Sequence, residues 1–117
     1  MGCVRGAAPG AVPGARLIFR RTRFGELIAR QLDLFERENA GDLAEATHLL
    51  ERYHVAGREE AEERYGDYQD ALQAVADLLE EMRDAYARTL DGPEADRYER
   101  ELARAVRQRF PDIELTS

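Results

Sequence analysis

The fold depends on how the stretch YHVAGREEAEERY, residues 53–65, is interpreted. Its small or aromatic positions follow one another in steps of four, at Tyr53, Gly57, Ala61 and Tyr65. That spacing continues the three-and-four pattern of the flanking sequence, so one apolar face keeps its phase through Gly57. We therefore predict one continuous helix over about residues 43–90. Because glycine costs roughly 1 kcal/mol relative to alanine inside a helix, an alternative interpretation breaks this helix near Gly57 and gives four helices.

The sequence on either side of this stretch predicts an all-α fold. No proline occurs between Pro13 and Pro93, strong helix formers prevail, and no stretch alternates with β-branched residues as a strand would. We expect a short helix over about residues 22–39 that ends before Gly41, then the long central helix. A short C-terminal helix follows the stop signal Asp91-Gly92-Pro93.

Length and composition predict a single helical domain over residues 22–117, preceded by a flexible, Gly/Ala/Pro-rich and basic segment over residues 1–21. The single cysteine excludes a disulfide framework. No apolar run approaches the ~20 residues that span a bilayer, so we expect no membrane association and a cytoplasmic location. All basic residues are arginine, which favours a GC-rich bacterial source.

Charge is distributed unevenly along the chain. The net charge is −7, yet no acidic residue precedes Glu26, so residues 22–117 hold 13 Arg against 24 acids. An acidic body repels phosphate backbones, and we expect no nucleic-acid binding. The basic stretch Arg16–Arg23 is interpreted as a solvated lead-in whose arginines meet the acidic body; an adaptor that docks on an anionic surface is the alternative.

The long apolar stripe predicts a homodimer. A short helix at each end cannot cover a helix of about 48 residues, and exposed apolar area of that extent normally marks an interface. Two copies with antiparallel long helices would form a dimeric helical bundle, a coiled-coil-like arrangement. The expected interface residues are Tyr65, Tyr68, Leu72, Val75, Leu79, Met82 and Tyr86.

Two Glu-x-x-His pairs, Glu45/His48 and Glu51/His54, are candidates for metal chemistry. This spacing is similar to that of ferritin-like carboxylate proteins, where such a pair joins a glutamate from a neighbouring helix. In a hairpin that turns near residues 40–41, Glu26 would lie level with His54 but would face solvent. We therefore expect no metal and no cofactor, and keep a Glu51/His54 site at a dimer interface as the alternative.

No sequence pattern supports nucleophilic catalysis or phosphate binding. The sequence therefore favours a non-enzymatic, self-associating or protein-interaction module. The alternative function is a ferritin-like carboxylate/histidine metal-binding protein that is completed at a dimer interface.

Overall fold

The computed structural model describes residues 23–116, which form four α-helices and no strand. The helices are α2 (Gly25–Glu38), α3 (Ala40–His54), α4 (Arg58–Ala87) and α5 (Gly92–Arg109). The all-α prediction is confirmed. The N-terminal segment over residues 1–21 and the predicted start of the first helix at residue 22 lie outside the described residues.

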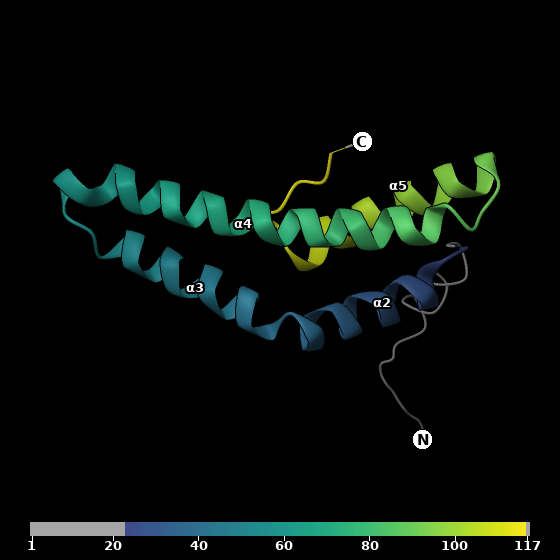
Figure 1. The fold of residues 1–117 in the computed structure, drawn as a ribbon, viewed down its shortest axis with the longest axis horizontal. Helices are drawn as coiled ribbons and strands as arrows, with labels where there is room; N and C mark the ends of the chain where they lie inside the picture. The colour runs from purple at the N-terminus through teal and green to yellow at the C-terminus, as the bar shows by residue number, and fades with distance from the viewer. Residues whose placement is uncertain (1–22, 117) are drawn as a thin grey trace, which may run out of the picture.

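The helices α2 and α3 are two parts of one bent helix that runs along α4 (Figure 1). The bend lies at Asn39, whose backbone N–H donates to the Phe35 carbonyl at 2.9 Å while its own carbonyl accepts from Leu43 at 3.0 Å. The Asn39 side chain also donates to the Phe35 carbonyl, at 3.0 Å, and this competition accounts for the local distortion. The predicted hairpin at residues 40–41 is therefore wrong, and Gly41 lies inside α3.

The chain reverses direction at Val55–Gly57, so the prediction of one continuous helix over residues 43–90 is wrong and the alternative break at Gly57 is correct. Gly57 has an extended backbone, with φ −74° and ψ 169°, and its carbonyl accepts from the Glu60 N–H at 3.0 Å. Folding back lets the two halves of the apolar stripe bury each other. A straight helix of this length would have left part of the stripe without a covering helix, and most helix stability comes from such packing.

The core of the molecule lies where α5 packs against α2 and the second half of α4 (Figure 1). Tyr98 of α5 is at its centre and is fully buried. Its ring lies 5.6 Å from the ring of Phe24 and 4.8 Å from that of Tyr86, measured between centroids. The Tyr98 hydroxyl donates to Oε1 of Gln31 at 2.8 Å, so the single buried polar group of this ring is satisfied.

Further polar contacts join α2 to α5. The Phe24 N–H donates to Glu101 at 2.9 Å, Arg23 pairs with Glu94 at 3.2 Å, and Arg109 pairs with Asp33 at 2.9 Å. The helix α5 begins at Gly92, inside the predicted stop signal, and Asp91 accepts the capping bond from the Glu94 N–H at 3.3 Å.

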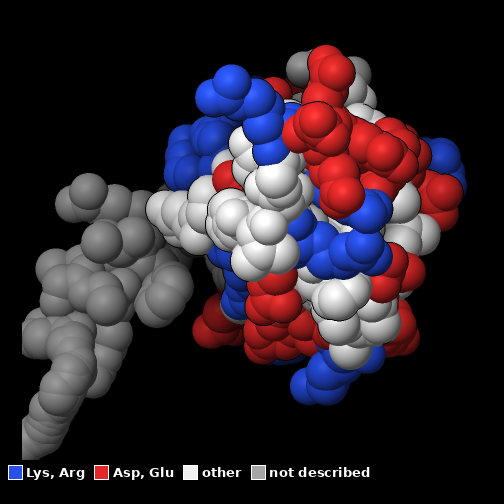
Figure 2. Space-filling view, turned by 90° about the vertical axis from the view of Figure 1, so that its left-hand side faces the viewer, with Lys and Arg blue, Asp and Glu red and all other residues white. Residues whose placement is uncertain are grey.

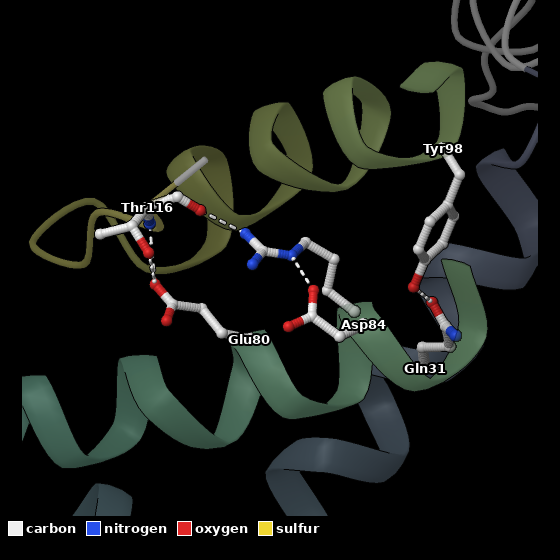
Figure 3. Close-up of polar contacts among 6 residues, drawn as sticks. Gln31, Glu80, Asp84, Tyr98 and Thr116 are labelled. Carbon is white, nitrogen blue, oxygen red and sulfur yellow. Dashed lines mark hydrogen bonds and ion pairs between the residues drawn. The ribbon is translucent and has the colours of Figure 1, made fainter. Parts of the chain in front are cut away.

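The C-terminal segment after α5 folds back over α4 (Figure 3). Ile113 is buried in the core, and both the backbone N–H and the hydroxyl of Thr116 donate to Glu80, at 2.7 and 2.8 Å. Arg83 donates to the Thr116 carbonyl and also to Asp84. These contacts attach the end of the described chain to the second half of α4.

Candidate interaction surface

About a third of the described residues form a part of the molecule that consists of two helices only. We call this part the two-helix arm and define it as residues 40–72, which comprise α3, the turn and the first half of α4; the three-helix end comprises α2, the second half of α4 and α5. In Figure 1 the arm extends to the left, beyond the reach of α5. Only Ala46 and Tyr68 are fully buried in the arm.

The arm leaves apolar side chains in contact with solvent. Val55 is 83% exposed and Tyr65 is 44% exposed, whereas Val75 and Leu79 of the three-helix end are 1% and 0% exposed. Leu49, Leu50 and Tyr53 are half-buried. We call these five residues, Leu49, Leu50, Tyr53, Val55 and Tyr65, the open seam.

Tyr65 lies on a face of α4 that other parts of the chain cover further along. Tyr65, Leu72, Ala76 and Leu79 follow one another in steps of seven, four and three, which places them on one side of the helix. Leu72 and Ala76 line a groove with Pro111–Thr116, and Leu79 belongs to the core. Tyr65 lies on the same face but beyond the end of the covering segment, and it is therefore left uncovered.

Aromatic rings of α3 and α4 pack against one another in the outer part of the arm. The Tyr53 ring, from α3, lies 5.0 Å from that of Tyr65, from α4, and Tyr65 lies 6.2 Å from Tyr68. The Tyr53 ring also lies 5.7 Å from the imidazole of His54. These contacts hold the two helices together across the turn, and they present one ring of the cluster to solvent.

The arm is strongly acidic. It holds nine Asp and Glu side chains against three Arg, a net charge of −6 within 33 residues. Figure 2 looks onto its outer end and shows uncharged side chains in the middle, acidic groups to the upper right and along the lower side, and basic groups to the upper left and beside the middle. A partner for this surface therefore has to combine apolar and basic groups.

The structure divides the seven predicted interface residues into three groups. Tyr68, Val75 and Leu79 are buried inside the single chain, and Leu72, Met82 and Tyr86 are half-buried against the same core. Burial by the chain's own helices accounts for these six. Tyr65 alone remains exposed, and for Tyr65 the interface stays a prediction.

The predicted metal-ligating pair lies on the arm. Glu51 and His54 are both exposed, as are Glu45 and His48. Glu26 lies at the opposite end of the bent helix, where it pairs with Arg30 at 3.6 Å, so it is not level with His54 as the hairpin had suggested. Within residues 23–116, no three His, Cys, Asp or Glu side chains are grouped closely enough to hold a metal ion.

A hollow of about 240 Å³ lies between α4, α5 and the C-terminal segment. Its lining includes Arg83 and Arg100 together with Asp96 and Glu99. Because cations and anions alternate around it, the hollow favours neither an anionic nor a cationic ligand.

Two tyrosines have perturbed acidity. Burial raises the pKa of Tyr98 to about 12, against a lowering effect of its hydrogen bond to Gln31. Burial also raises the pKa of Tyr68 to about 12, and the carboxylate of Asp112, which accepts from the hydroxyl at 2.9 Å, adds to the shift. Both hydroxyls serve packing and hydrogen bonding, and neither points to a catalytic role.

Sequence reasoning missed the remaining members of the open seam. Val55 does not fit the apolar stripe, and it became a surface residue only because the chain turns beside it. Leu49 and Tyr53 were assigned to the body of a long helix. The signal that could have found them is the glycine at position 57 between two stripes of similar length.

Comparison of the chain with protein-family models, with curated proteins and with solved structures found no match. Among residues 23–116, no helix combines the length and the apolar character that crossing a bilayer requires. The surface itself is therefore the basis for a functional proposal.

Proposed function

We propose that this protein is a non-enzymatic module that self-associates, with the two-helix arm of each copy packed along a second copy. The observation that carries the proposal is the open seam: α5 covers one half of α4, Tyr65 remains exposed on the other half, and Val55 remains exposed in the turn before α4. Burying such residues against a partner removes apolar area from water, at about 25 cal/mol per Å².

Charge selects the orientation of the two copies. Two arms of net charge −6 would repel each other if they met directly. Among the four described helices, α5 alone has more arginine than acidic side chains, five against four. The described residues outside the arm also carry a net charge of −5, from ten Arg and fifteen acids. An antiparallel pair, in which the arm of one copy lies along α5 of the other, keeps the two acidic arms apart and places each beside the helix that is richest in arginine.

The test is the mass of the full chain in solution, measured by light scattering after size exclusion. We expect twice the 13.3 kDa of one chain at micromolar concentration. Tyr65→Asp places a charge at the most exposed ring of the seam and should shift the population to monomer, because burying an unpaired carboxylate is unfavourable.

Ala74→Asp is the matched control, because it adds the same charge at an exposed α4 position that lies neither in the arm nor on α5, the helix along which the partner's arm is proposed to lie. It should leave the dimer intact. A wild-type mass of one chain at 100 μM protein, or equal effects of both substitutions with unchanged helix content, would refute self-association through the arm.

A further inference from the structure

We infer, given the proposed dimer, that the basic segment over residues 16–22 of one copy docks on the acidic two-helix arm of the other copy. The segment reads RLIFRRT and contains three arginines, three large apolar residues and no acid. The arm presents the complementary chemistry: half-exposed apolar residues set among nine carboxylates. Opposite charge and shared apolar character together specify this occupant.

The length of chain before α2 decides which copy's arm the basic segment can reach. The distance from Gly25 to Tyr53 along α2 and α3 is about 42 Å at 1.5 Å per residue. Phe19 lies six residues before Gly25, and even a fully extended chain carries it only about 20 Å. The outer part of a copy's own arm is therefore beyond the apolar residues of its own segment.

The antiparallel dimer removes this limit. The described chain is 56 Å long, and α2 begins at the end opposite to the arm (Figure 1). In an antiparallel pair the start of α2 in one copy therefore lies beside the outer arm of the other. The anchor of the segment is well defined, because Arg23 pairs with Glu94 and the Phe24 N–H with Glu101.

The arm has exposed carboxylates next to residues of the open seam. Glu62 is exposed one turn before Tyr65, and Glu51 is exposed directly after Leu50. Neither carboxylate has an ion-pair partner within 4.0 Å among the described residues, whereas Glu60 already pairs with Arg64 at 3.6 Å. Arg20 and Arg21 follow Leu17, Ile18 and Phe19 directly, so apolar and charged contacts can form together.

Charge reversal in the full-length chain tests the inference. R20E/R21E and, separately, E51R/E62R should each weaken self-association about tenfold in sedimentation velocity, because each turns attraction into repulsion. An equimolar mixture of the two variants should recover wild-type affinity within about threefold, since each segment then meets an arm of opposite charge on the other chain. The control is a mixture of R20E/R21E with D77R/E81R, which makes the same change of charge as E51R/E62R at exposed α4 positions outside the arm. This mixture should not recover wild-type affinity.

The possible results separate this inference from the proposed function. A monomeric wild type overturns both. A wild-type dimer that R20E/R21E leaves unchanged overturns the docking and leaves self-association standing. Loss of affinity in both variants without recovery in the mixture also overturns it, because the segment would then act within its own chain. If anionic vesicles dissociate the wild-type dimer but have no effect on R20E/R21E, the segment binds a lipid surface. That result also overturns the docking on the arm.

Discussion

The two-helix arm and the three-helix end use the same kind of amphipathic helix but bury their apolar side chains to different depths. At the three-helix end each helix faces two others, and Leu79, Tyr98 and Leu102 are fully buried. In the arm each helix faces one other, and even the best-placed apolar residues, apart from Ala46 and Tyr68, keep contact with water. The difference shows that a stripe of apolar residues fixes which face is buried, whereas the number of neighbouring helices fixes how deeply.

The largest expected effect comes from removing the same side chain in the three-helix end and in the arm. Leu79→Ala empties a site that is 0% exposed and should lower the free energy of unfolding by about 3–4 kcal/mol. Leu50→Ala acts on a half-buried arm residue and should cost about 1 kcal/mol, because solvent already reaches the site.

Urea unfolding followed by circular dichroism, at one fixed protein concentration, measures both variants. Equal losses for the two substitutions would mean that the arm is as tightly packed as the three-helix end, which would contradict the comparison. A loss at Leu50 that grows with protein concentration would instead locate Leu50 in the dimer interface.

The next largest effect is expected on the free energy of unfolding at alkaline pH. The chain contains no lysine, so tyrosine hydroxyls dominate its titration between pH 10 and pH 12. The pKa of Tyr98 and of Tyr68 is raised to about 12 from 10.0, chiefly by burial. In this window the unfolded chain loses protons that the folded chain retains. The resulting contribution to stability is complete below pH 10 and is lost as the pH rises to 12.

Tyr98→Phe keeps the buried ring and removes the titrating group together with its hydrogen bond to Gln31. It should cost about 1 kcal/mol at pH 7 and reduce the loss of stability between pH 10 and pH 12. Tyr68→Phe tests the hydroxyl at the border of the arm in the same way. Absorbance at 295 nm measures ionisation, and an unchanged late step in the Tyr98→Phe, Tyr68→Phe double variant would rule out the assigned shifts.

Much of the fold was predictable because periodicity and stop signals are local. The three-and-four spacing identified the apolar face of α4, and Asp91 and Pro93 identified the turn before α5. The break at Gly57 was predicted only as the alternative, because a stripe keeps the same phase whether the helix continues or folds back on itself. Only the tertiary burial gained by folding back decides between the two, and spacing does not contain that quantity.

The candidate surface was predictable to a smaller extent for the same reason. Val75 and Leu79 were correctly read as apolar positions that need a partner, yet the partner that buries them is within the chain. Tyr65 was identified, and its exposure depends on where α5 and the C-terminal segment end. The bend at Asn39 was assigned to Gly41, because a glycine after a helical pattern is the commoner stop signal.

The smallest effect concerns Gly66, an exposed position in the arm half of α4. A Cβ added there meets no atom within 4 Å, so the fold of one chain gives no reason for glycine at this site. Gly66→Ala should therefore raise the free energy of unfolding by about 0.5–1 kcal/mol, because alanine loses less backbone entropy in a helix.

Ala74→Gly, at an exposed position of the same helix, should lower the free energy of unfolding by a similar amount. Both follow from urea unfolding below the concentration at which dimers form, and part of the looseness of the arm is then a matter of composition. A Gly66→Ala variant that is more stable as a monomer but associates more weakly would place another backbone close to Gly66 in the dimer, since close approach is the other reason for a glycine on a helix surface.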